Sequence, residues 1–158
     1  MSKYNFGNVS KQRLSTCHID IQKVLNLALS RSCVDFGVSE GYRPIEKQQE
    51  YYAIGRTVDI NKPTITNIDG INKKGNHNYL PSRAVDIYIY HPDPEIRKKI
   101  AFDPVHLGYI AGLIESCSKE LLEKGETTHE IRWGNNWDRD GVIAYDQNLD
   151  DAPHFEII

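Results

Sequence analysis

The chain has 158 residues, of which 39% are hydrophobic and 26% charged, a composition typical of an ordinary folded domain. Its 19 Lys and Arg residues are outnumbered by 22 Asp and Glu residues, and the formal net charge of -3 lacks the basic excess of a nucleic-acid-binding protein. The low mean hydropathy gives no indication of a membrane span. We therefore expect one domain over residues 1–158, with neither nucleic acid nor membrane as a partner.

The N-terminal residues contain no apolar run of signal-peptide length and no small-residue cleavage site, so we expect synthesis in the cytoplasm without a leader. Cys17, Cys33 and Cys117 show no C-x-x-C spacing and lie in stretches with apolar periodicity. This pattern predicts buried free thiols rather than disulfides or a thiolate metal site. A bound metal would then be held by histidines and carboxylates.

The first third of the chain predicts two helices separated by a strand. Apolar side chains recur at helical spacing after Thr16, which we expect to cap the first helix. The alternation in residues 34–38 predicts a half-buried strand. Pro44 suits the first turn of a second helix, which we expect to end near Ala53. Arg43 therefore lies at the corner between a strand and a helix.

The rest of the chain predicts a long loop, three strands and a helix. Residues 56–83 show no sustained period, and a loop of that length in a compact domain is usually functional or disordered. The alternation in residues 84–90 predicts a strand with Asp86 on its less apolar face. Further elements are a helix from Asp103 to Gly125 and strands over 130–133 and 153–158, the last with His154 and Glu156 on one face.

Two histidines lie next to strands whose faces could meet. His77 precedes Asp86, and His154 opens the last strand. Two imidazoles and one carboxylate leave the fourth position of a zinc ion open for water, which is typical of catalytic zinc. A single histidine on a strand is more often structural, and the spacing alone leaves both interpretations open. The remaining histidines match no motif, and we expect them to be structural or exposed: His18, His91, His106 and His129.

The motifs around these residues resemble those of the M15 family of zinc peptidases. Residues 76–86 read NHNYLPSRAVD and are similar to the family motif S-x-H-x-x-G-x-A-x-D, with two more residues between histidine and aspartate and with Ser82 where glycine is common. Residues 150–154 read DDAPH, with an acid three positions before the histidine. The resemblance covers most of the chain and is to the bacteriophage L-alanyl-D-glutamate endopeptidase branch, through FGNVSKQRLSTCHIDIQKVL, SEGYRPIEKQQEYYAIGRT and RWGNNWDRDG.

The resemblance implies a role for each site residue. His77, Asp86 and His154 would be the zinc ligands. Asp151 would be the general base that takes a proton from the attacking water. Arg43 would bind a substrate carboxylate or the oxyanion that develops on the scissile carbonyl, because a guanidinium is always charged and donates two parallel hydrogen bonds.

The residues themselves leave alternatives open at two of these positions. Asp151 could be a solvated turn residue, and the neighbouring Asp150 could be the acid that matters instead. Arg43 could be a surface side chain paired with Glu40 or Glu46. Two further residues could contribute to the same pocket: Gln49 and Ser82.

The resemblance implies an α+β fold, with a small antiparallel sheet that carries Asp86 and His154 on one face and packs helices on the other. It implies zinc-dependent cleavage of the L-alanyl-D-glutamate bond in peptidoglycan by a monomeric phage endolysin, which acts on the wall after release from the host cytoplasm. One alternative is a D,D-carboxypeptidase or D-Ala-D-Ala dipeptidase. Another is a non-catalytic cell-wall binding module that contains zinc.

Overall fold

The computed structural model describes residues 3–143 and 146–158. Four strands form one sheet in the order β1-β2-β4-β3, and all neighbouring strands are antiparallel. The strands are β1 (Phe36–Glu40), β2 (Ala84–Ile89), β3 (Ile131–Trp133) and β4 (His154–Ile157). The helices are α1 (Asn8–Leu14), α2 (Ile19–Arg31), α3 (Ile45–Ala53), α4 (Pro94–Ile100), α5 (Pro104–Glu123) and the 3-10 helix η1 (Asn76–Asn78).

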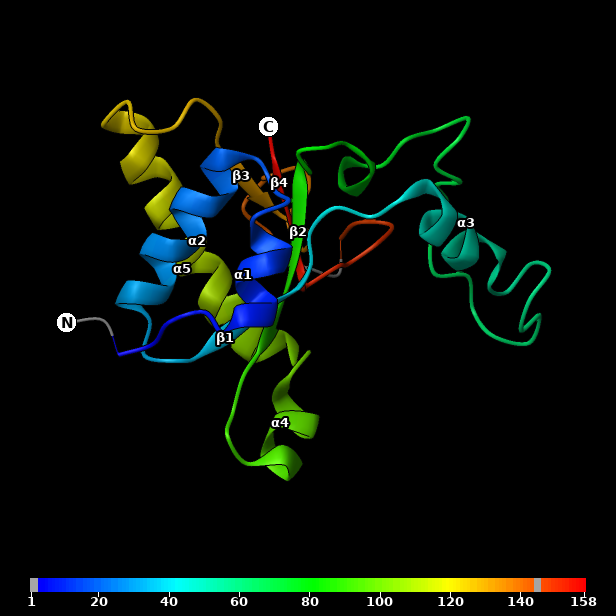
Figure 1. Cartoon of the computed structure of the whole chain (residues 1–158), viewed down its shortest axis with the longest axis horizontal. Helices are drawn as coiled ribbons and strands as arrows, with labels where there is room; N and C mark the ends of the chain where they lie inside the picture. The colour runs from blue at the N-terminus through cyan, green and yellow to red at the C-terminus, as the bar shows by residue number, and fades with distance from the viewer. Residues whose placement is uncertain (1–2, 144–145) are drawn as a thin grey trace.

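The core lies between the sheet and the two longest helices. Helices α2 and α5 contact each other, and both contact the sheet on the same side (Figure 1). Their apolar stripes are fully buried, as the helical spacing predicts. Ile87 of β2 and Phe155 of β4 point into this core with none of their surface exposed. The opposite face of the sheet is free to carry polar groups.

Alternation along β2 and β4 places the candidate site on that opposite face. Val85, Ile87 and Ile89 are buried against the helices, so Asp86 points outward. In β4, Phe155 faces the core and His154 faces outward. The predicted α+β class is confirmed, with helices on one face of an antiparallel sheet and the candidate metal ligands on the other.

Some sequence expectations are corrected by the structure. Helix α2 is capped by His18, whose Nδ1 accepts from the Asp20 N–H, and not by Thr16. Cys33 is exposed, whereas the other two cysteines are buried. Helices α1 and α4 were not predicted. Helix α4 buries none of its residues and so lacks an apolar stripe, although Asp93 followed by Pro94 is a helix-start signal of the same kind as Asp103 followed by Pro104.

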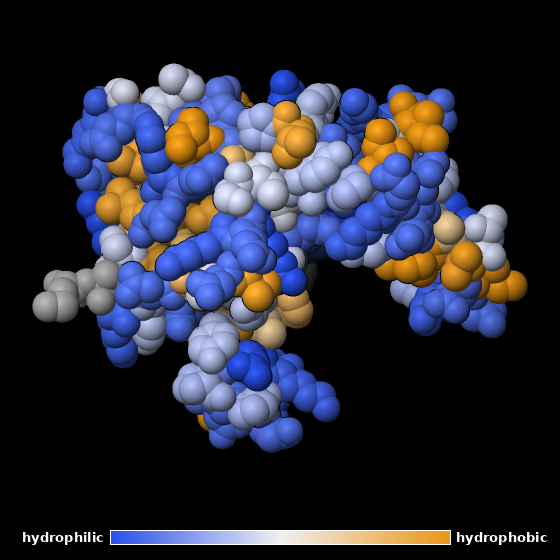
Figure 2. Space-filling view, viewed as in Figure 1, coloured by the Kyte–Doolittle hydropathy of each residue, from blue (hydrophilic) through white to orange (hydrophobic). Residues whose placement is uncertain are grey.

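Helix α3 and the loop after it form a lobe that projects from the body of the molecule (Figure 1). The end of this lobe carries exposed apolar side chains, including Val58, Ile60 and Ile65. Figure 2 shows orange, hydrophobic surface on the same lobe. The predicted long loop is confirmed, with η1 as its only helical turn in the described residues. Within the described ranges, no helix has both the length and the apolar character needed to cross a membrane.

Candidate active site

The three predicted metal ligands meet on the outer face of the sheet. Asp86 of β2 and His154 of β4 are directly paired in the strand register, and His77 reaches them from η1. His77 Nε2 lies 3.1 Å from Asp86 Oδ1 and 3.2 Å from His154 Nδ1, while His154 Nδ1 lies 3.1 Å from Asp86 Oδ1. Both imidazoles are buried. Three donor atoms from three separate segments therefore converge on one point.

This arrangement fits a tetrahedral zinc ion. Zn–N bonds of ordinary length place neighbouring ligand atoms about 3.3 Å apart, close to the observed separations. The second nitrogen of each ring is already engaged: His77 Nδ1 lies 2.7 Å from the Gly41 carbonyl oxygen, and His154 Nε2 lies 3.1 Å from a carboxylate oxygen of Glu156. When these nitrogens donate to their oxygen partners, the unprotonated nitrogen of each ring faces the cluster.

Asp86 and His154 are electrostatically coupled. Burial alone would raise the pKa of Asp86, but the imidazoles of His77 and His154 outweigh it and hold that pKa well below its usual range. Burial also lowers the pKa of His154, whereas its hydrogen bonds to Asp86 and Glu156 raise it to about 9, so metal binding would displace the proton on Nδ1. Asp86 is therefore a carboxylate at neutral pH, as a metal ligand must be.

Glu156 is a site residue that the sequence analysis did not assign. Besides its contact with His154, its carboxylate accepts from Asn76 Nδ2 at 2.7 Å and from Arg132. Burial opposes ionisation, but the hydrogen bonds from His154, Arg132 and Asn76 outweigh it and lower the pKa of Glu156 to about 2. The sequence feature that could have identified Glu156 is the H-x-E spacing in β4, because residues two apart on a strand share a face. Glu156 orients the His154 ring.

A β-bulge brings a third acid, Glu40, to the same face. Val38 pairs with Ile87, but the next paired residue on β1 is Glu40, which stands opposite Asp86. Ser39 is the extra residue. In a regular strand Ser39 would stand opposite Asp86, and the side chain of Glu40 would point to the core face. The bulge explains why strict alternation along β1 does not predict this position.

Arg43 lies within the site and not on the surface. Its Nε donates to Glu40 at 3.0 Å, its Nη1 donates to Gln48 Oε1 at 3.0 Å, and its Nη2 lies 3.5 Å from Asp86 Oδ2. The side chain is only 14% exposed. Arg43 therefore pairs with Glu40 and also lies beside the predicted metal ligands, so the two alternatives hold together. Two anchors fix the guanidinium next to the cluster.

The expectation for Gln49 is wrong by one residue. Gln49 is exposed, whereas Gln48 is 2% exposed and also donates from Nε2 to the Ile68 carbonyl at 2.7 Å. Gln48 thus ties the long loop to Arg43. Ser82 is fully buried, and its hydroxyl donates to the Ala84 carbonyl at 2.7 Å, so it stabilises the entry to β2.

Asp151 lies beside the ligand cluster. Burial raises the pKa of its carboxyl group; the negative charge of Asp86 adds to this effect, and the imidazole of His154 opposes it. The backbone fixes its position, since its N–H donates to the Gly134 carbonyl at 3.1 Å and its carbonyl accepts from the His154 N–H at 3.0 Å. Asp150, in contrast, is exposed and accepts from Gln147. A partly buried carboxyl with a raised pKa is suited to proton transfer.

Gly134→Ala should destabilise the fold by about 1–3 kcal/mol, the usual cost of forcing an extra group into a packed position. An added Cβ would lie 2.2 Å from the Asp151 carbonyl oxygen, so the backbone beside the site would have to move. Urea denaturation measures the loss. The matched control is Gly112→Ala in α5, where nothing lies within 4 Å of the new Cβ and stability should hold or rise. Equal stability of the two variants would contradict this close approach.

Trp137 forms part of the wall beside His154. Its ring centroid lies 5.3 Å from that of His154, and its indole N–H donates to the Leu149 carbonyl at 2.8 Å. Trp133 is instead a core residue, buried and hydrogen-bonded to the Ala152 carbonyl at 2.7 Å. Trp133 therefore belongs to the core, while Trp137 anchors its loop and also contacts the site.

The other histidines have structural partners. One Asp20 carboxylate oxygen accepts from the backbone N–H groups of Thr128 and His129 and lies 2.8 Å from His129 Nδ1. Although His18, Asp20 and His129 also bring ligand atoms near one another, this oxygen is already occupied in joining the start of α2 to the segment before β3. The remaining two histidines have partners near the starts of helices: His91 accepts from the Asp93 N–H, and His106 contacts Asp103.

Comparison with known proteins gives the family and the fold. A family model described as phage L-alanyl-D-glutamate peptidase matches residues 1–158. The fold resembles the crystal structure of Serratia marcescens L-Ala D-Glu endopeptidase ChiX, with a TM-score of 0.66 and 22% identity over 99% of this chain and 92% of that chain. A search of curated proteins found no match. Because the family model spans all of its residues, the chain belongs to the phage L-alanyl-D-glutamate peptidase family.

Proposed function

We propose that the chain is a zinc-dependent endopeptidase that cleaves the L-alanyl-D-glutamate bond of peptidoglycan stem peptides. The observation that carries this proposal is the convergence of His77 Nε2, Asp86 Oδ1 and His154 Nδ1 at separations of 3.1–3.2 Å. Asp151 beside the cluster supports catalysis over a purely structural metal site, because a structural site has no use for a base. Family membership supports the peptidase class.

His77, Asp86 and His154 would hold the zinc ion. When bound, zinc would polarise the scissile carbonyl and lower the pKa of a water molecule to about 7. Asp151 would take the proton from the attacking water and deliver it to the leaving amine. The raised pKa of Asp151 suits both steps, because a carboxyl that gains a proton more readily is the better base and still a competent acid.

Arg43 would stabilise negative charge on the substrate. Glu40 and Gln48 hold its guanidinium in place, so little rotamer freedom is lost when it binds a carboxylate or an oxyanion. Its Nη2 lies 3.5 Å from Asp86 Oδ2, which places a fixed positive charge next to the ligand cluster.

Arg43→Ala should retain the fold and the zinc but lose at least roughly one to two orders of magnitude in kcat/KM, as expected for removing one oxyanion donor. Arg43→Lys should recover little, because an ammonium cannot replace a planar fork held by two anchors. The measurement is peptide hydrolysis with zinc content determined in parallel. A matched control is Arg56→Ala in the α3 lobe, whose guanidinium bonds to Tyr52 and Asn67 away from the cluster. Near-normal turnover of Arg43→Ala would reduce it to a structural residue.

Mass spectrometry of digested sacculi tests the reaction itself. Zinc-loaded protein should release fragments with a new N-terminal D-glutamate, and chelated protein should release none. Free D-alanine or the D-Ala-D-Ala dipeptide would instead identify the alternative, a D,D-carboxypeptidase or dipeptidase. Binding to sacculi without any released fragment would identify a non-catalytic wall-binding module.

We also propose where the enzyme acts. A phage endolysin made in the host cytoplasm would act on the wall after release and contribute to host lysis. We propose that it acts as a monomer, since the convergent site draws all its groups from one chain. Expression together with a separate route across the membrane should lyse cells, while expression alone should not.

A further inference from the structure

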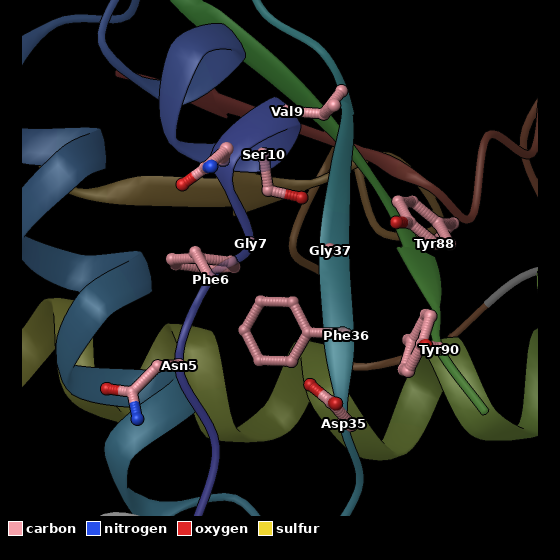
Figure 3. Close-up of a pocket in the computed structure, with 11 residues that line it drawn as sticks. Asn5, Phe6, Gly7, Val9, Ser10, Asp35, Phe36, Gly37, Tyr88 and Tyr90 are labelled. Carbon is pink, nitrogen blue, oxygen red and sulfur yellow. The ribbon is translucent and has the colours of Figure 1, made fainter. Parts of the chain in front are cut away.

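A cavity of about 390 Å³ lies at the outer edge of β1, away from the ligand cluster. Figure 3 shows Phe6 and Phe36 on one side of β1 and Tyr88 and Tyr90 on the other. Its size is within the range of small-molecule sites. The rest of the lining is small or polar: Asn5, Gly7, Asn8, Val9, Ser10, Asp35 and Gly37.

The part of this cavity that Tyr88 lines lies on the same sheet face as the candidate active site. Tyr88 stands two residues after Asp86 on β2, so their side chains share a face about 7 Å apart along the strand. A Cβ on Gly37 would lie 2.6 Å from the Tyr88 ring, so glycine lets this ring lie close against β1. The Arg97 guanidinium lies over the Tyr90 ring, 5.2 Å from its centroid.

The spacing matches the chemistry of the proposed substrate. In peptidoglycan, the L-alanine before the scissile bond is joined through a lactyl group to the pyranose ring of N-acetylmuramic acid. The L-alanine and the lactyl group together span about 7 Å when extended. A pyranose presents C–H groups on its faces and hydroxyl and acetamido groups at its rim, which suits a cavity that combines aromatic rings with polar side chains.

The charged residues at the two ends of β1 favour one orientation of the bound stem peptide. Asp35 is the only lining residue with a charged side chain in the described part of the chain, and this disfavours the carboxylates of the stem peptide. At the opposite end of β1, Arg43 and Lys47 surround the single carboxylate of Glu40. The D-glutamate side of the substrate carries the carboxylates, whereas the muramoyl side is neutral once its lactyl group is amidated.

We propose that the cavity lined by Tyr88 and Tyr90 is a sugar subsite that binds the N-acetylmuramoyl residue attached to the stem peptide. This inference rests on the proposed function, because it assumes that the scissile bond lies beside Asp86. The stem then runs from Tyr88 towards Arg43. The enzyme would recognise the bond by the sugar that precedes it as well as by the peptide.

Two measurements test the subsite. The first compares kcat/KM for an N-acetylmuramoyl tripeptide with that for the same tripeptide carrying an acetyl group in place of the sugar. The sugar should increase kcat/KM about 10-fold, the size of one or two aromatic contacts. The second uses NMR to measure the binding of N-acetylmuramoyl-L-alanine amide, which has no scissile bond. The affinity is compared with that of N-acetyl-L-alanine amide, which lacks the sugar.

Tyr88→Ala and Tyr90→Ala should each remove most of the sugar advantage and leave hydrolysis of the acetylated peptide unchanged. Tyr88→Phe should retain the advantage because it keeps the ring. Tyr109→Ala is the matched control, since Tyr109 is an exposed tyrosine on α5. Circular dichroism checks that each variant is folded. If an alanine variant does not fold, the comparison of Tyr88→Phe with the parent protein still tests the subsite.

The outcomes separate this inference from the proposed function. Equal kcat/KM for both substrates, with no binding of the muramoyl probe, would overturn the subsite and leave the peptidase intact. Binding of the probe that depends on Tyr88 and Tyr90, without cleavage of either substrate, would support the subsite and overturn the peptidase. A sugar advantage that survives in both alanine variants would also overturn the proposal.

Discussion

Replacing His77 or His154 with alanine should yield a folded protein that no longer retains zinc and no longer cleaves peptidoglycan. Each imidazole offers one nitrogen to the cluster while the other is engaged by Gly41 or Glu156. Without either ring, the site keeps two ligands, and zinc affinity should fall by more than the roughly 10–100-fold that loss of an orienting partner costs. The core is on the other face of the sheet, so the fold should persist.

Elemental analysis and thermal unfolding measure this loss together. A ligand that binds only the folded state stabilises it by about 4 kcal/mol when present at a thousand times its Kd. Chelator should therefore lower the melting temperature of the parent protein and leave that of the two variants unchanged. His106→Ala is the control, because His106 contacts Asp103 at the start of α5. Full zinc occupancy in the His77 or His154 variant would remove that residue from the ligand set.

Local patterns predicted the elements that carry the site. The alternation in residues 84–90 places Asp86 opposite a fully apolar face, and the same rule places His154 and Glu156 together. Both predictions are confirmed because each strand turns its apolar side chains to the core and its polar side chains to the other face. Register errors of one residue would reverse those faces, so the burial of Ile87 strongly fixes the alignment.

Contacts between distant segments were not predictable in the same way. The direct pairing of Asp86 with His154 depends on strand order, which one sequence does not specify. The bulge at Ser39 breaks the alternation along β1, and Gln48 rather than Gln49 faces Arg43 because the long loop folds back over α3. Each of these outcomes is decided by tertiary packing, which local periodicity does not encode.

The ligand cluster also shows why the motif tolerates a longer spacing. His77 belongs to η1 and not to β2, so residues 79–83 form a connection outside the sheet. The His77 ring is placed by the Gly41 carbonyl and by the Arg43 N–H, which donates to the His77 carbonyl at 2.8 Å. Anchors at the end of β1, independent of the length of the connection, therefore position this imidazole.

Asp151→Asn should retain zinc and thermal stability while losing about 100-fold or more in kcat, the upper part of the range for a general base. Asn has nearly the same shape as Asp, and the backbone bonds of Asp151 to Gly134 and His154 do not involve its side chain. The amide cannot accept the proton of the attacking water. The cost should therefore appear in the chemical step and leave the metal in place.

Asp86→Asn should behave in the opposite way, with zinc affinity falling first. The carboxylate of Asp86 contacts both imidazoles and faces Arg43, so a neutral amide both ligates zinc more weakly and leaves Arg43 with one fewer anionic neighbour. Excess zinc should restore part of the activity of Asp86→Asn and none of that of Asp151→Asn. Zinc content and cleavage rate, measured side by side, assign each acid to its role.

Asp150→Asn is the control that checks the position of the base. Asp150 is exposed, so this variant should keep both zinc and rate. If Asp150→Asn loses activity while Asp151→Asn cleaves at the parent rate, the base is the neighbouring acid and the burial of Asp151 has another cause. If neither change affects cleavage, no acid of this pair is the base, and the proton must be taken by a group outside the 150–154 segment.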